Sequence, residues 1–308
     1  MDNATIKSIT QTLKPMTDVL SRRMSQQTGQ RVILMYHGID KQAFFNCVAA
    51  GHFKEQLSWL QERYSVVPLS VLVDALQFPG PSNRAENLAA ITFDDGYVNF
   101  AEWAAPILQE YKMHATVFLP TGKAGSYNDW DEGMSGFHKM EIMTYAMLRQ
   151  LPEQTVEVGS HGIAHLPLDQ LSCSEIQKEI VQSRVDIEQS IGRPVRFFSF
   201  PYGVYPFKFR RGLRDRKNEL LGGYRAACTT WWGRYNTRKD VHMLRRVGIW
   251  DIDTFDDFTD KLQGSYDWLV KKESVGRYYN VMKNLFSSRF QYPFEKVIHY
   301  EQNKTARS

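Results

Sequence analysis

Seven short apolar runs, separated by segments with helical spacing of apolar residues, constrain the fold of this chain more than any other feature. Apolar runs of this length indicate buried strands, and their alternation with helices indicates a parallel sheet. The expected strands are 32–36, 89–93, 115–119, 156–159, 197–200, 226–230 and 244–249. The pattern predicts an α/β fold closed into a (β/α) barrel, with an active site at the C-terminal ends of the strands.

Helical spacing of apolar residues fills the segments between these runs. The expected helices are 53–64, 70–78, 100–111, 142–151, 171–191 and 213–221. In the longest of them Ile176, Ile180, Ile187 and Ile191 recur at helical spacing. We expect this stripe to pack against the barrel as core.

Size and composition fit a single barrel with short additions. The chain has 308 residues, of which 43% are apolar, and a net charge of +4. Because no basic stripe laced with aromatic residues follows one element, the sequence argues against binding of nucleic acid. The three cysteines, Cys47, Cys173 and Cys228, show no CxxC spacing, which fits small core thiols in a reducing compartment.

Targeting signals are not evident in the sequence. The first residues lack the long apolar stretch of a signal peptide, and no run approaches the roughly 20 apolar residues that cross a bilayer. We therefore expect a cytoplasmic protein.

Metal-binding side chains follow two of the expected strands. Asp94 and Asp95 come directly after one apolar run, and His161 and His165 come after another, four residues apart. On a helix this spacing would bring both imidazoles to one cation. Each pattern alone has a simpler explanation, a turn for Asp-Asp-Gly and a chance pair for the histidines. Together, Asp95, His161 and His165 give three ligands and an open position, the layout of a catalytic zinc site.

A third pattern, Pro201-Tyr202-Gly203, follows the strand expected at 197–200. With Thr92-Phe93-Asp94-Asp95-Gly96 and Ser160-His161-x-x-x-His165, it resembles the polysaccharide deacetylase family, the NodB homology domain of carbohydrate esterase family 4. The resemblance runs from about residue 31 to about residue 264. It implies a distorted seven-stranded (β/α) barrel that hydrolyses the N-acetyl group of an amino sugar with a divalent metal, for which we expect zinc.

The resemblance also implies roles for individual residues. Asp95, His161 and His165 match the metal ligands of the family, and Asp94 matches the general base that takes a proton from the attacking water. The backbone N–H of Tyr202 matches the donor that stabilises the tetrahedral oxyanion.

Two departures from the family pattern call for substitutes. The arginine that usually orients the base is absent before Pro201, and Arg246 on the last expected strand is the candidate to replace it; the alternative is a surface arginine. The late leucine-x-histidine motif has only Ile298-His299 as a counterpart, in an unfavourable place. His37, after the first strand, is therefore the candidate to protonate the departing amine or to hold a sugar hydroxyl, the alternative being a core histidine.

Aromatic residues near the strand ends are candidates for binding the sugar. Trp130 and Trp231 can stack on a pyranose, with Pro201 and Tyr202 beside them, although such residues are more often core. Six basic residues in 208–217 could hold the phosphate of a nucleotide-linked or lipid-linked substrate, while a solvated helix face is the simpler reading.

Both ends lie outside the resemblance, which divides the chain into three parts. Residues 1–30 are expected to form an amphipathic helix, 31–264 the barrel, and 265–308 a basic, aromatic extension. The extension either packs on the barrel, which we favour, or contacts the inner face of a membrane.

The expected function is N-deacetylation of an amino sugar during assembly of a surface polysaccharide such as capsule, O-antigen or exopolysaccharide. One alternative keeps the chemistry with another substrate, namely a formyl group, chitin or a peptidoglycan fragment. Another is a catalytically silent glycan-binding module.

Overall fold

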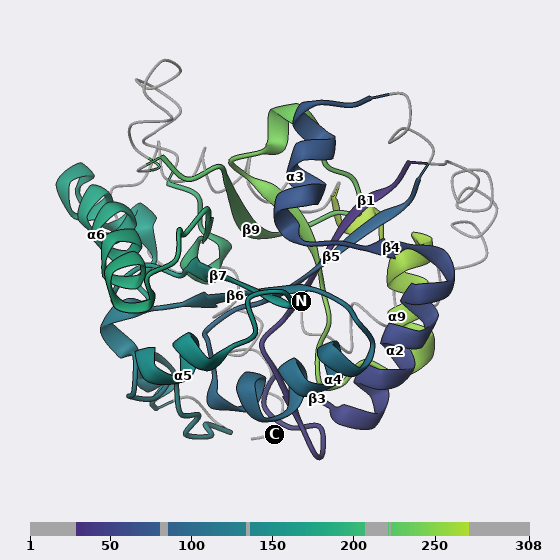
Figure 1. Ribbon diagram of the computed structural model, residues 1–308, viewed down its shortest axis with the longest axis horizontal. Coiled ribbons are helices and arrows are strands. Elements are labelled where there is room, and N and C mark those ends of the chain that lie inside the picture. The colour runs from purple at the N-terminus through teal and green to yellow at the C-terminus, as the bar shows by residue number, and fades with distance from the viewer. Residues whose placement is uncertain (1–28, 81–85, 134–135, 207–220, 222, 271–308) are drawn as a thin grey trace, which may run out of the picture.

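The computed structural model describes residues 29–80, 86–133, 136–206, 221 and 223–270. Seven parallel strands close into a barrel in the order β1, β10, β9, β8, β7, β6 and β5, and β5 pairs with β1 to complete the ring (Figure 1). Their bounds are β1 Arg31–Tyr36, β5 Leu88–Phe93, β6 Ala115–Leu119, β7 Val156–Ser160, β8 Phe197–Ser199, β9 Ala226–Trp232 and β10 Leu244–Gly248. The predicted α/β fold, a seven-stranded (β/α) barrel, is confirmed, and each strand end lies within two residues of its expected place.

Short strands add to this ring. The two-residue strand β4 (Ser65–Val66) pairs with the start of β5, on the side of β5 where β6 pairs farther along. Strands β2 (Gly38–Asp40) and β3 (Cys47–Ala49) form a separate parallel pair just after β1. The sequence patterns predicted none of these three.

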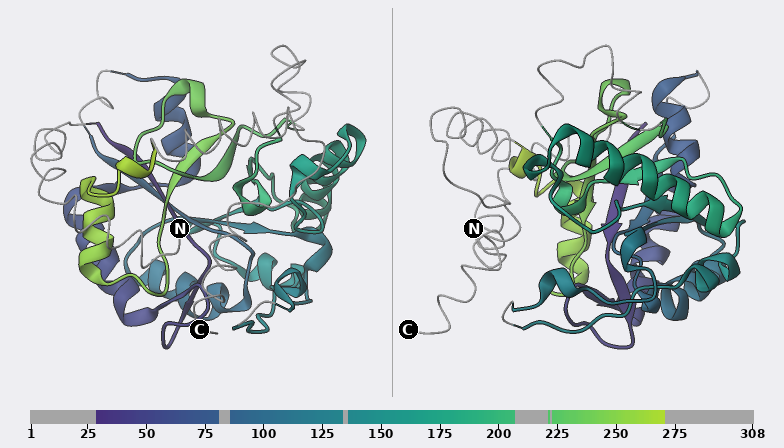
Figure 2. Two further views of the ribbon diagram at one scale, coloured as in Figure 1. Left: turned by 180° about the vertical axis from the view of Figure 1, so that it is seen from behind. Right: turned by 90° about the vertical axis from the view of Figure 1, so that its left-hand side faces the viewer.

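Helices cover the outside of the barrel. Their bounds are α2 Ala50–Arg63, α3 Leu69–Gln77, α4 Ala105–Glu110 preceded by a π-helical turn at Phe100–Ala104, α5 Tyr145–Gln150, α6 Cys173–Ile191 and α9 Phe255–Gln263. Helices α2 and α9 lie side by side on one flank, and α6 lies on the other (Figures 1 and 2). Helix α9 was not expected, whereas the helix expected at 213–221 falls almost entirely outside the described residues.

Helix α6 illustrates how local sequence sets an element's bounds. Ser172 and Glu175 form a reciprocal capping box at its start, and Gly192 ends it in the left-handed conformation with φ 69°. The isoleucine stripe expected to be core, Ile176, Ile180, Ile187 and Ile191, is buried.

Alternation along the strands sorts side chains between the inside and the outside of the barrel. Outward residues, such as Ile91 and Phe93 of β5, pack in one cluster with the surrounding helices. Inward apolar residues form a second cluster, which includes Phe118 and Leu244 and also Leu72 of α3. Helix α3 therefore closes the barrel at the N-terminal ends of the strands, and the opposite end is left for polar residues.

Several expectations concern segments outside the described residues. They are the N-terminal helix, the basic segment 208–217, and residues 271–308 of the C-terminal extension. Among the described helices, none has both the length and the apolar composition needed to span a bilayer.

Candidate active site

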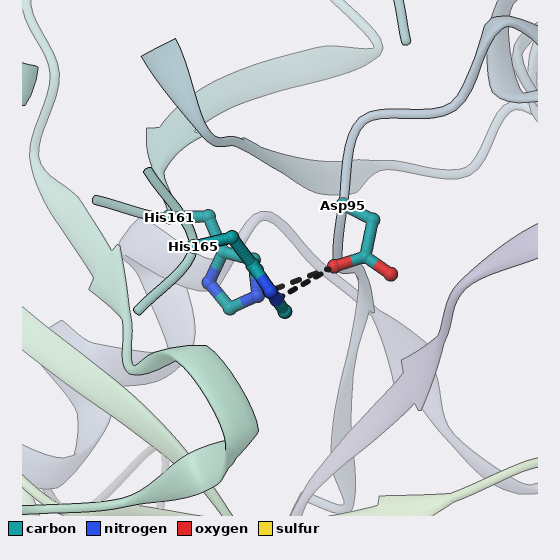
Figure 3. A group of neighbouring side chains, drawn as sticks. All are labelled: Asp95, His161 and His165. Carbon is teal, nitrogen blue, oxygen red and sulfur yellow. Dashed lines mark ion pairs between the residues drawn. The ribbon is translucent and has the colours of Figure 1, made fainter. Parts of the chain in front are cut away.

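Asp95, His161 and His165 meet at the C-terminal end of the barrel (Figure 3). Asp95 follows β5, and both histidines follow β7. Their ligand atoms all lie within 4.8 Å of one another, and all three side chains are buried. The Oδ1 atom of Asp95 lies 3.4 Å from Nε2 of His161 and 3.3 Å from Nε2 of His165.

These distances fit a divalent cation. Zinc binds imidazole nitrogen and carboxylate oxygen at about 2.0–2.1 Å, so two ligands at a tetrahedral angle stand about 3.3 Å apart. The two measured separations agree with this value. The three residues can thus hold a cation such as zinc and leave a position open.

His161 is oriented by the neighbouring strand end. Its Nδ1 atom lies 2.7 Å from the carbonyl oxygen of Ser199 and, as the N–H tautomer, donates to that oxygen. This leaves Nε2 to face Asp95, as in metal-bound histidines whose second nitrogen donates to a carbonyl. Burial lowers the pKa of His161, but Asp94 and Asp95 raise it, and the net pKa lies above the usual value. A proton and a metal therefore compete for this ring.

The expectation that His161 and His165 share a helix is wrong, although the two rings do meet. Strand β7 ends at Ser160, and the residues that follow form a tight irregular turn. Gly162 has φ 77° and His165 has φ 53°, and both values are incompatible with a right-handed helix. The ring of His165 lies 4.1 Å from that of Trp130 and 4.7 Å from that of Tyr202, centroid to centroid.

Left-handed backbone marks this part of the molecule. Asp95, His165 and Tyr202 have φ values of 67°, 53° and 57°, although none is glycine. Such conformations cost free energy and persist where the surrounding structure enforces them, often at functional sites. Three separate turns thus adopt unfavourable backbone to bring their side chains to one point.

Arg246 lies against Asp94 inside the barrel. Its two terminal nitrogens donate to the two carboxylate oxygens of Asp94 at 2.8 and 2.6 Å, and it also donates to Thr92, Ser199 and the carbonyl of Thr229. Arg246 is fully buried. Burial raises the pKa of Asp94, but the Arg246 guanidinium and then His161 lower it, so that the net pKa lies below the usual value.

The position of Arg246 follows from its strand. On β10, Leu244 points into the barrel and belongs to the inner cluster, so Arg246, two residues later, points inward as well. On β5 the same alternation runs from Ala90 to Thr92 and on to Asp94. The two inward columns therefore bring Asp94 and Arg246 together, and the alternative of a surface arginine is excluded.

Comparison with known proteins adds the family. The family model described as polysaccharide deacetylase matches residues 82–219, which span the aspartates, both histidines and the Pro-Tyr-Gly turn. Over this segment the chain is similar to the polysaccharide deacetylase family. It is accordingly an enzyme, a polysaccharide deacetylase. The matched segment excludes His37 and Arg246.

Individual relatives are distant but cover much of the chain. YxkH of Bacillus subtilis (strain 168), named as a polysaccharide deacetylase, is 25% identical over 245 residues, 79% of this chain and 80% of its own length. A poly-beta-1,6-N-acetyl-D-glucosamine N-deacetylase of Staphylococcus aureus (strain MSSA476) is 22% identical over 207 residues, 59% of this chain and 68% of the relative.

Solved structures share the fold of this deacetylase. Streptococcus pyogenes deacetylase PplD in complex with acetate superposes with a TM-score of 0.61 at 21% identity, covering 76% of this chain and 99% of that chain. IcaB from Ammonifex degensii gives a TM-score of 0.61 at 18% identity, covering 75% and 96%.

His37 lies directly after β1, within the same mouth of the deacetylase barrel. Its ring stacks on that of Trp250 at 5.2 Å, and its Nδ1 atom is buried without a hydrogen-bond partner among the described residues. Trp250 follows β10 and was missed by the sequence analysis. The only sequence feature that could have indicated a role for Trp250 is its place just after a barrel strand, and many tryptophans in such places belong to the core.

The expected sugar-binding aromatics occupy different surroundings. Trp130 stacks on the ring of His165. Trp231 is half-buried on β9, with the Arg245 guanidinium 6.0 Å from its ring centre. Pro201 is buried and begins the turn that carries Tyr202. Trp130 and Tyr202 thus adjoin the candidate metal site.

Proposed function

We propose that this deacetylase hydrolyses the N-acetyl group of an amino sugar in a polysaccharide and depends on a divalent metal, with zinc as our choice. The observation that carries the proposal is the pairing of an ionised, arginine-bound Asp94 with the adjacent Asp95, His161 and His165. A base and a metal site side by side are what hydrolysis of an unreactive amide requires.

Asp95, His161 and His165 would hold the metal. When bound, it would polarise the amide carbonyl and make water a better nucleophile by lowering its pKa. Tyr97 is buried beside this set, where burial and then the charge of Asp95 raise the pKa of its hydroxyl. The carboxylate of Asp95 has a pKa well below the usual value. Burial raises this pKa, but the hydrogen bonds and charges of His161 and His165 lower it by more. It is thus ready to act as an anionic ligand.

Asp94 would act as the general base. A low pKa keeps it ionised at neutral pH, so that it can accept the proton of the attacking water. Arg246 would hold the carboxylate in place with two parallel hydrogen bonds, an arrangement that fixes direction as well as charge. Arg246 would thus replace the arginine that this chain lacks before Pro201.

The remaining roles concern the oxyanion and the leaving amine. The left-handed turn at Tyr202 adjoins His165, which supports its backbone N–H as a donor to the developing oxyanion. His37 would protonate the departing amine, and Trp250, stacked on its ring, would keep the imidazole at the mouth of the barrel. Trp130 would provide an apolar surface next to His165 for the sugar.

The relatives suggest the class of substrate and the setting. One acts, by its name, on poly-beta-1,6-N-acetyl-D-glucosamine, so we propose a polymer of N-acetylated amino sugar, made during assembly of a surface polysaccharide. Cytoplasmic location, a nucleotide or lipid carrier on the substrate, and membrane contact through the C-terminal extension stay predictions. The last two rest largely on residues outside the described part of the chain.

The experiment is an assay of purified protein on oligomers of β-1,6-linked N-acetylglucosamine, measuring released acetate and new primary amine together. We expect equal amounts of both from the wild type and almost none from Asp94→Asn. N-formyl oligomers run in parallel test the alternative acyl group. No release of acetate from any N-acetylated oligomer, by protein that retains its metal, would contradict the proposal.

A further inference from the structure

A single carboxylate holds the loop between the two histidines. The backbone N–H groups of Ile163 and Ala164 both donate to Oε2 of Glu179, at 2.6 and 3.2 Å. Two successive amides aimed at one oxygen form a small anion-binding concavity, filled here by the protein's own side chain. Glu179 belongs to α6, so a helix on the flank of the barrel reaches into the loop that ends at His165.

The surroundings of Glu179 are unusual for a charged residue. It is buried, with 8% of its surface exposed, and it sits beside Ile180 on the face of α6 that packs against the barrel. Among the described residues, no lysine or arginine forms an ion pair with it. A buried carboxylate is costly unless hydrogen bonds compensate it, and the two loop amides provide them.

The opposite side of the loop is held as well. The carbonyl oxygens of Gly162 and Ile163 accept from the N–H groups of Thr121 and Gly122, at 2.9 and 2.8 Å. Gly162 has φ 77°, and a Cβ there would lie 3.0 Å from Oε2 of Glu179. The loop thus lies between two sets of hydrogen bonds, and a side chain at residue 162 would both strain the backbone and push the Glu179 carboxylate aside.

Glu179 is part of a polar row on α6. Ser183, one turn later, hydrogen-bonds through its hydroxyl to that of Ser160 at the end of β7, at 2.7 Å. Asp186, almost one turn further, accepts from the hydroxyl of Thr121 at 3.1 Å. The row runs beside the isoleucine stripe and holds three points around the histidine loop.

The two histidines differ in what fixes them. His161 has its Nδ1 bonded to a carbonyl, whereas Nδ1 of His165 is buried without a hydrogen-bond partner among the described residues. The place of the His165 ring therefore depends on its backbone and on the rings around it. The backbone of the preceding residue, Ala164, is held by Glu179.

We propose that Glu179 is a positioning residue for the metal site, acting through the amides of Ile163 and Ala164 to fix His165 as a ligand. This inference rests on the proposed metal site. Loss of the carboxylate lets the loop relax, so that the geometry of His165 toward Asp95 and His161 is no longer set in advance. The consequence is weaker metal binding.

The test measures zinc affinity of metal-stripped protein by competition with a chromogenic chelator. Loss of partners behind a metal ligand typically weakens binding 10- to 100-fold. We expect Glu179→Leu near the upper end, about 100-fold, and Glu179→Gln, which keeps one acceptor oxygen, near the lower end, about tenfold. Visible absorption of the cobalt-substituted protein gives a second reading, because it reports ligand geometry; we expect it to change in both variants.

The matched control is Glu188→Gln. Glu188 lies on the same helix and accepts hydrogen bonds from the N–H of Val195 and from Arg184, away from the ligands. It should lower thermal stability and leave zinc affinity and the cobalt spectrum unchanged. Wild-type affinity in Glu179→Gln, or an equal loss in Glu188→Gln, overturns the inference even if Glu179→Leu fails to fold. A wild type that binds no zinc overturns the metal site itself.

Discussion

The two ends of the barrel interior are made by the same strands and have opposite chemistry. At the N-terminal end Leu88 and Leu244, the first residues of β5 and β10, belong to one apolar cluster with Leu72 of α3. At the C-terminal end Asp94 and Arg246 form a buried ion pair beside the candidate metal ligands. On β10 only one residue separates the inward Leu244 from the inward Arg246.

This contrast separates stability from catalysis. The apolar end stabilises the folded barrel by burying apolar side chains. The polar end removes charged side chains from water, which costs hydration free energy and adds little stability. Substitutions at the first end should change unfolding and leave the reaction alone, and substitutions at the second should change the reaction.

Removal of a metal ligand should have the largest effect. His165→Ala leaves two ligands, so we expect the bound metal to be lost and turnover to fall to the background rate. Elemental analysis and acetate release measure the two effects. His114→Ala, at a histidine outside the site, is the control and should change neither. Equal metal in His165→Ala and wild type would show that this residue is no ligand.

Removal of the base should separate metal from turnover. Asp94→Asn keeps Asp95, His161 and His165, so the metal should stay, while turnover should fall by about 10²- to 10⁴-fold, the usual contribution of a general base. Asp95→Asn should lose both metal and turnover. The assignment of Asp94 fails if Asp94→Asn deacetylates at nearly the wild-type rate.

Arg246→Met should move the acidic limb of the pH–rate profile. Without the guanidinium, burial dominates and the pKa of Asp94 rises, so the limb should shift to higher pH by about one to three units, with metal content unchanged.

The same variant should also lose stability, because an uncompensated buried charge costs about 3–5 kcal/mol of unfolding free energy at neutral pH. In the wild type the low pKa of Asp94 stabilises the fold above its unfolded pKa, and this contribution is lost as pH falls through the folded pKa.

Arg245→Met is the neighbouring control for that experiment. Arg245 lies one residue away and faces Trp231 rather than the barrel interior, so its loss should leave the acidic limb in place. An unshifted limb in Arg246→Met would reduce Arg246 to a structural residue.

Leu72→Ala should have the smallest effect on catalysis. Leu72 is fully buried in the apolar end, and truncation of such a residue to alanine costs about 2–5 kcal/mol of unfolding free energy. Denaturant unfolding measures this loss. Zinc affinity and the acidic limb should match those of the wild type. A shifted acidic limb of the pH–rate profile in Leu72→Ala would show that the two ends are coupled and would contradict their division into a stabilising end and a catalytic end.

Apolar periodicity predicts the seven barrel strands, but for Arg246 it allows both an inward position and a surface position. Apolar runs gave the seven strands, and two-residue alternation is why Arg246 meets Asp94. Periodicity fails at the histidines, because four-residue spacing predicts a helix whereas Gly162 and His165 adopt left-handed backbone. That turn is held by Glu179, a contact between residues far apart in sequence that no local pattern reveals.

Other misses have the same physical origin. Trp250 meets His37 only because β10 and β1 are neighbours in the closed ring, which the order of strands along the chain does not tell. Helix α9 begins with a capping box formed by Thr254 and Asp257, and its packing partner is α2, far away in sequence. Local signals define elements, whereas closure of the barrel defines contacts.

The central claim is that the polar end of the barrel catalyses metal-dependent N-deacetylation with Asp94 as base. Its most direct test is a zinc titration of metal-stripped wild type and Asp94→Asn, with zinc uptake and acetate release from β-1,6-linked N-acetylglucosamine oligomers measured in the same samples. We predict that both proteins take up about one zinc per chain, and that acetate release rises with uptake in the wild type alone. Undiminished release by stripped wild type, or a parallel rise in Asp94→Asn, would contradict the account.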